Sequence, residues 1–181
     1  MASEVRYVAL LRGINVGGHR MIKKEELTEI FEGAGVTDVQ TVLASGNVIF
    51  TSLESDERTL TNLIELALET SLEYRVDVMV RTIAYIREIV ELDPFGPYDT
   101  VGNKFYVTFL TSAPDSAPEM PHKLTEQRAL AVALHDREFF SISHKTSDGR
   151  YGDFGPFMKA TFGKQPVTTR NWNTVVKLAA M

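Results

Sequence analysis

The sequence predicts an α+β protein built from two tandem ferredoxin-like subdomains, each with the element order β-α-β-β-α-β, followed by a C-terminal helix. Short runs of β-forming residues alternate with segments whose apolar residues recur at helical spacing, and this order repeats along the chain. A length of 181 residues suffices for two units of about 90 residues. The segment PFGPY, with two prolines and a glycine, separates them, so we expect subdomains over residues 1–93 and 94–181.

The first half contains four expected strands and two expected helices. Residues 5–11 are apolar at nearly every position, as in a strand covered on both faces. Residues 44–47 (ASGN) form a hairpin turn, because glycine and asparagine tolerate positive φ. Ser55 or Asp56 caps the second helix. The elements are a strand at 5–11, a helix around 22–31, strands at 39–43 and 48–50, a helix from 60 to 72 and a strand at 76–80.

The second half repeats the pattern less clearly. The proline-rich stretch TSAPDSAPEMPHK reads as a surface loop, Asp148-Gly149 as a turn, and Pro156 as the first turn of a helix. A linker helix at 83–92 ends the first subdomain. The elements of the second half are a strand at 105–110, a helix at 124–134, strands at 138–144 and 150–154, a helix from 156, a strand at 167–169 and a closing helix in NWNTVVKLAAM.

Composition excludes several function classes. The chain has no cysteine, which removes disulfides, thiolate metal sites and cysteine nucleophiles. Its net charge of −5 and pI near 5.4 argue against nucleic acid as a partner. The four histidines lack metal-ligand spacing, and neither a dinucleotide fingerprint nor a P-loop is present, so we expect no metal and no cofactor. We find no signal peptide and no membrane span and expect a cytoplasmic protein.

The best candidate site is a polar rim formed by two motifs, RGINVGG and ASGN, which the predicted topology brings to the same end of one sheet. Residues 12–24 carry a local charge of +4 and no acid, which favours an anion. The alternative is purely structural: the glycines only make a tight turn, Ser45 and Asn47 only shape a hairpin, and the basic residues only form a solvated face. The rim residues are Arg12, Asn15, Gly17, Gly18, His19, Ser45 and Asn47.

A second polar cluster, TTRNWNT, precedes the closing helix. Arg170 and Asn171 are candidate ligand-binding residues in it. The alternative is structural: Thr169 or Asn171 caps the helix, Trp172 packs it onto the core and Arg170 pairs with a carboxylate.

Three functions remain open on this evidence. The first is binding of a small anionic or nucleotide-like ligand at the rim, where Arg12 and backbone N–H groups meet the anion. The second is a phosphate-ester or acyl-transfer enzyme that uses Ser45 or His19 at the same rim. The third is a nucleic-acid or protein interaction module that uses the sheet.

Three segments carry a family resemblance: RGINVGG after the first strand, SGNVIF in the hairpin, and TTRNWNTVVKL before the closing helix. On these motifs the chain resembles the bacterial domain-of-unknown-function family 1697 over nearly its whole length. The resemblance implies two ferredoxin-like units in tandem and assigns no reaction. The residues that match motif positions are Arg12, Gly13, Asn15, Gly17, Gly18, Ser45, Gly46, Asn47, Arg170 and Asn171.

Overall fold

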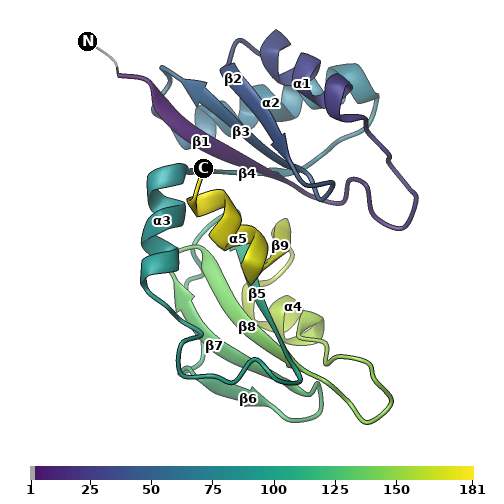
Figure 1. Cartoon of the computed structure of the whole chain (residues 1–181), viewed down its shortest axis with the longest axis vertical. Coiled ribbons are helices and arrows are strands. Elements are labelled where there is room, and N and C mark those ends of the chain that lie inside the picture. The colour runs from purple at the N-terminus through teal and green to yellow at the C-terminus, as the bar shows by residue number, and fades with distance from the viewer. Residues whose placement is uncertain (1–2) are drawn as a thin grey trace. The chain divides into compact units, whose positions relative to one another are not determined.

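The computed structural model describes residues 3–181, which form two compact units. The first unit contains residues up to Glu88 together with Leu178–Met181, and the second contains Ile89–Lys177. Each unit is built on one antiparallel sheet, and five helices are assigned in the described part of the chain (Figure 1). The chain is therefore a mixed α+β protein, as predicted.

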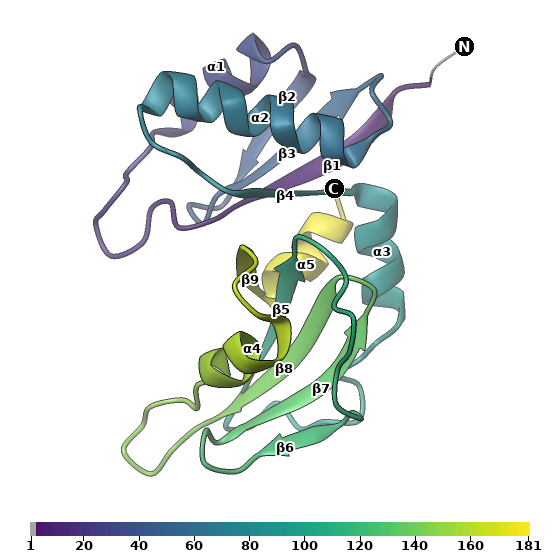
Figure 2. The ribbon, with the colours of Figure 1, turned by 180° about the vertical axis from the view of Figure 1, so that it is seen from behind.

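The first unit has a four-stranded sheet with the order β2-β3-β1-β4. Helices α1 and α2 lie on the same face of that sheet, as Figures 1 and 2 show from opposite sides. The core between them contains stacked Tyr7 and Phe50, with ring centroids 5.5 Å apart, and Phe31 beside them. Its elements are β1 (Val5–Leu11), α1 (Lys24–Gly33), β2 (Thr37–Val42), β3 (Asn47–Ser52), α2 (Glu57–Leu72) and β4 (Val78–Thr82).

Helix α2 shows how local sequence sets an element's bounds. The Asp56 carboxylate accepts hydrogen bonds from the backbone N–H groups of Arg58 and Thr59, so Asp56 is the N-cap. Leu60, Ile64 and Leu68 recur at helical spacing and are buried. The predicted cap and apolar stripe are confirmed.

The second unit has a five-stranded sheet with the order β6-β7-β8-β5-β9. Helix α4 packs on one face, where Phe162 contacts Phe139 with ring centroids 5.2 Å apart. Trp172 packs against Phe95 and Phe140 and so anchors the start of the closing helix, as predicted. Helix α3 (Ile83–Glu91) begins in the first unit and ends in the second. The remaining elements are β5 (Asn103–Leu110), β6 (His122–Leu124), β7 (Ala129–His135), β8 (Glu138–His144), α4 (Gly155–Phe162), β9 (Val167–Asn171) and α5 (Trp172–Ala179), whose last two residues belong to the first unit.

The predicted helix at 124–134 is wrong. Residues 122–124 form strand β6, a turn follows, and 129–135 form strand β7, which pairs with β8. Alanine and leucine have high helix propensity. Here, however, pairing with β8 supplies the backbone hydrogen bonds, and this tertiary contact outweighs the local preference for a helix. The second unit consequently has no helix between β5 and β7 within the described residues.

Two smaller predictions also need correction. The expected strand at 150–154 is reduced to a single bridge between Tyr151 and Lys145. In the β2–β3 hairpin the positive φ angles fall on Leu43 (60°) and Gly46 (77°), not on Asn47. The hairpin itself is confirmed.

Candidate functional site

The structure brings the two predicted motifs together at one end of the first sheet. Leu10 pairs with Asn47, and Leu11 pairs with Val78, so the end of β1 lies beside the starts of β3 and β4. The Leu11 N–H donates to the Gly46 carbonyl at 2.8 Å. The predicted rim residues all lie in two of the three segments that meet here, and from this point we use the name rim for all three segments: 12–24, 43–47 and 74–77.

The second half of RGINVGG and the two residues after it form a miniature hairpin, residues 15–20, which we call the finger. Val16 and His19 form an antiparallel bridge, and the turn between them is made by Gly17 (φ 59°) and Gly18 (φ 77°). Two consecutive positive φ angles are what a tight two-residue hairpin turn requires. The two glycines are therefore explained by the turn itself, with no ligand needed.

The side chain of Asn15 fixes the base of the finger. Its Nδ2 donates to the Ala44 carbonyl at 2.9 Å, and its Oδ1 accepts from the Ile22 N–H at 2.8 Å. Asn15 has a φ of 53°, which asparagine tolerates better than most residues. This amide thus joins the RGINVGG segment to the hairpin.

Asn47 and Ser45 have local roles in the hairpin. Asn47 is fully buried, and its Nδ2 donates to the Val42 carbonyl at 2.9 Å and to Ser45 Oγ at 3.0 Å. Within residues 3–181, no hydrogen bond connects the His19 imidazole to Ser45. The pairing that a Ser45–His19 nucleophile would need is therefore absent from the described residues.

Two arginines pair with one carboxylate at the rim, and a third lies over the neighbouring Tyr74 ring. Arg12 Nη1 lies 3.0 Å from Asp77 Oδ2, and Arg75 Nε lies 3.2 Å from Asp77 Oδ1. The Arg20 guanidinium sits over the ring of Tyr74 at 4.9 Å from its centroid. We call Arg12, Arg20 and Arg75 the three-arginine cluster.

Sequence reasoning missed Arg75, although the signal was available. Arg75 lies 63 positions after Arg12 in the chain, outside either motif. The predicted strand order, however, places the residues before the last strand next to the end of the first. Following that register from Val78 back to Arg75 would have found it.

Arg170 and Asn171, the remaining predicted site residues, belong to the second unit. Arg170 is buried in β9, where its Nη1 donates to Thr168 Oγ1 at 2.7 Å, and burial lowers its pKa to about 10. Asn171 Oδ1 accepts from the Asn173 N–H at 3.0 Å and so caps α5. Both side chains thus have structural roles within the second unit.

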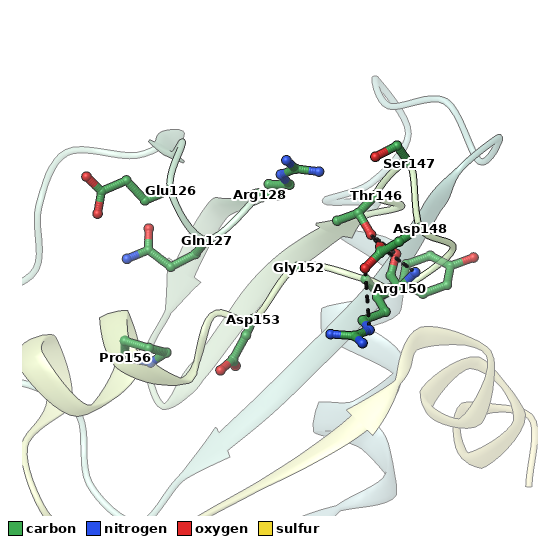
Figure 3. Close-up of a pocket in the computed structure, with 11 residues that line it drawn as sticks. Glu126, Gln127, Arg128, Thr146, Ser147, Asp148, Arg150, Gly152, Asp153 and Pro156 are labelled. Atoms are coloured by element: carbon green, nitrogen blue, oxygen red, sulfur yellow. Dashed lines mark hydrogen bonds and ion pairs between the residues drawn. The ribbon is translucent and has the colours of Figure 1, made fainter.

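A pocket that the sequence did not reveal lies in the second unit (Figure 3). Its volume is about 440 Å³, and it is lined by the turn at 126–128, the loop at 146–153 and Pro156 at the start of α4. This size falls within the range of small-molecule sites. The Asp148-Gly149 turn was predicted, but the β6–β7 turn opposite it was hidden by the wrong helix assignment.

Over residues 3–181, no three His, Asp or Glu side chains gather as a group that could hold a metal ion. None of the helices described here combines the length and apolar character that crossing a bilayer requires.

Comparisons with known proteins identify the family of the chain. No curated protein matches it significantly. Among solved structures, it is similar to a conserved bacterial protein, SP0830 from Streptococcus pneumoniae, with a TM-score of 0.67 and 17% sequence identity over 98% of each chain. At that identity the likeness shows the fold alone. A family model described as a protein of unknown function, DUF1697, matches residues 5–140. The chain therefore belongs to the DUF1697 family, as its motifs indicated.

Proposed function

We propose that the protein binds a small anionic ligand at the rim of its first unit, through the three-arginine cluster. The observation that carries this proposal is the sharing of one carboxylate by two guanidinium groups, Arg12 and Arg75 on Asp77. One carboxylate neutralises one guanidinium, so the pair keeps a positive charge, and Arg20 adds another. A cluster with a surplus of guanidinium groups favours a multivalent anion.

The exposure of these groups supports ligand access. The side chains of Arg12 and Arg75 are 52% and 69% exposed, whereas that of Asp77 is 18% exposed. A ligand can therefore reach the cations without displacing other protein groups. Ion pairs of such exposure contribute about 0–1 kcal/mol to folding, so the cluster is not explained by stability.

The surroundings favour a ligand with both anionic and apolar parts, such as a nucleotide or another organic phosphate. Val16, Met21 and Leu43 are apolar rim residues, 64%, 68% and 50% exposed. Arginine pairs with phosphate oxygens in a two-pronged geometry, and the apolar side chains can cover a base or a hydrocarbon portion. Glu25 and Glu26 in the first turn of α1 limit the positive charge on the side of Lys23 and Lys24.

Thermal-shift and calorimetric titration of the full chain with pyrophosphate, nucleotides and sugar phosphates test the proposal. A ligand of the native state raises the melting temperature by mass action. We expect at least one organic phosphate to do so, with Arg12→Gln and Arg75→Gln weakening the effect. Arg58→Gln is the matched control, because Arg58 lies in the first turn of α2, which follows the end of β3 beside the start of β1, at the end of the sheet opposite the rim. Equal weakening by all three variants, or no effect of any phosphate, would refute the proposal.

We also infer that the chain arose by duplication of a ferredoxin-like unit. In support, the first sheet has the order β2-β3-β1-β4, and four strands of the second follow the matching order β7-β8-β5-β9. In this interpretation the first helix of the second unit has been replaced by the loop and strand β6.

A further inference from the structure

The pocket of the second unit has a floor made of closely packed backbone. The Gly152 N–H donates to the His144 carbonyl, and the Asp153 N–H donates to the Gln127 carbonyl, each at 3.0 Å. A Cβ at Gly152 would overlap the carbonyl oxygens of Gln127 and Arg128, although the φ of Gly152 is not positive. Gly152 is thus required by close approach of two backbone segments, and this contact sets the depth of the pocket.

One wall of the pocket is held in place by Asp148. Its carboxylate accepts from the Thr146 hydroxyl and from the Arg150 N–H, and it forms an ion pair of 3.4 Å with Arg150 Nε. The hydrogen bond from Thr146 is the main cause that lowers the pKa of Asp148. Asp148 and Arg150 therefore form an ion pair between two exposed side chains, and the other charged groups of the lining are Glu126, Arg128 and Asp153.

Those remaining groups carry both signs of charge. Within the described residues, neither the Arg128 guanidinium nor the Glu126 carboxylate forms a hydrogen bond or an ion pair, although the positive charge of Arg128 contributes to the lowered pKa of Asp148. One oxygen of Asp153 accepts from the Gly155 N–H at 2.8 Å. In Figure 3 Arg128 extends toward Thr146 and Asp148, whereas Glu126 lies with Gln127 on the other side. The pocket therefore presents an acidic side and a cationic side.

This separation of charge selects among ligand classes. A polyanion would meet the carboxylates of Glu126 and Asp153, and a bare cation would meet the Arg128 guanidinium. A stacked sugar ring needs an open aromatic face, but Lys104 Nζ lies 4.0 Å from the centroid of the Tyr151 ring. A zwitterion fits, because its ammonium meets carboxylates while its carboxylate meets a guanidinium.

We propose that this pocket binds a zwitterionic α-amino acid derivative or short peptide with free termini. The ligand ammonium pairs with Glu126 and Asp153, and the ligand carboxylate pairs with Arg128. At about 440 Å³ the pocket is large enough for a dipeptide. This site is independent of the anion site at the rim of the first unit, so either can fail without the other.

The test is an NMR titration of the full-length ¹⁵N-labelled protein with the dipeptide Ala-Ala, its N-acetyl form and its C-terminal amide. We expect Ala-Ala to shift amide signals of the 125–128 and 146–153 segments in a saturable way. Each blocked form loses one of the two ion pairs, so we expect it to bind roughly tenfold more weakly or worse.

Variants locate the two ends of the ligand. Glu126→Gln and Arg128→Gln should each weaken Ala-Ala binding roughly tenfold. Glu119→Gln and Lys123→Gln, which alter exposed charges outside the pocket lining, should leave the binding unchanged. Gly152→Ala, checked for folding by its amide spectrum, should abolish binding, because the added Cβ would push apart the two backbone segments that form the floor of the pocket.

The proposal is overturned if Ala-Ala produces no saturable shifts, if the blocked forms bind as tightly as Ala-Ala, or if the control variants weaken binding as much as Glu126→Gln and Arg128→Gln. Saturable binding of pyrophosphate at these same amides in preference to Ala-Ala would also overturn it and would indicate an anion site instead.

Discussion

The side-chain amide of Asn15 donates a hydrogen bond of 2.9 Å to the carbonyl oxygen of Ala44, a residue 29 positions further along the chain. This bond joins the loop after β1 to the turn between β2 and β3. It explains why the two motifs belong together: one supplies the amide and the other supplies the carbonyl. The cations of the rim are thus displayed on a braced loop instead of a free one.

Asn15→Gly should lower the free energy of unfolding by about 1–2 kcal/mol, because two hydrogen bonds are lost while glycine still accepts the positive φ. Urea denaturation measures the loss. Hydrogen exchange provides a specific readout: the Ile22 amide, which donates to Asn15, should exchange faster, whereas amides of β1 should stay protected. Unchanged exchange at Ile22 would show that the brace is not formed in solution.

Gly46 and Gly17 should respond differently to alanine. Both have positive φ, but a Cβ at Gly46 would lie 2.7 Å from Ile14 Cγ1, whereas a Cβ at Gly17 would meet nothing within 4 Å. We expect Gly17→Ala to lower the free energy of unfolding by about 1 kcal/mol through strain alone. Gly46→Ala adds overpacking and should lower it by roughly 2–4 kcal/mol. Equal losses in urea denaturation would contradict this account of the hairpin.

The cap of α2 predicts a pH dependence. Hydrogen bonds from Thr59 and Arg58 lower the pKa of Asp56 below its ordinary value of 3.8. A carboxyl with a lowered folded-state pKa stabilises the fold above its unfolded pKa, and this contribution is lost as the pH falls through the folded value. Asp56→Asn keeps a capping side chain but cannot titrate.

The wild type should therefore be more stable than Asp56→Asn at neutral pH, and the difference should shrink as the pH falls below about 4. Thermal unfolding at a series of pH values measures it. A difference that is independent of pH would mean that the Asp56 charge does not contribute to the cap.

Most of the first unit was predictable because its local signals agree with its tertiary structure. Residues 5–11 form β1 as predicted, and Asp56 caps α2 where the sequence placed a cap. The predicted order of strands also placed RGINVGG beside ASGN. Arg75 was not predicted as a site residue, because its proximity to Arg12 depends on the register between β1 and β4, which no local motif displays.

The second unit was harder because local propensity and tertiary pairing disagree. Residues 129–134 (ALAVAL) have high helix propensity, yet they pair with β8 and residues 129–132 are buried. The polar pair Asp136-Arg137 between two apolar runs was the available signal for a hairpin, and in the structure Asp136 adopts a φ of 49° in the turn between β7 and β8. The pocket depended on the turn between β6 and β7 at 125–128, which the predicted helix at 124–134 concealed.

The central claim is that the rim binds anions because the three-arginine cluster carries surplus positive charge. Calorimetric titration with pyrophosphate of the wild type, Arg75→Gln and Asp77→Asn tests it most directly. Arg75→Gln removes a cation, whereas Asp77→Asn removes the competing carboxylate at nearly constant shape. We predict severalfold weaker binding in the first variant and severalfold tighter binding in the second, with both effects reduced by added salt. Weaker binding in both variants, or the same affinity in all three proteins, would contradict the claim.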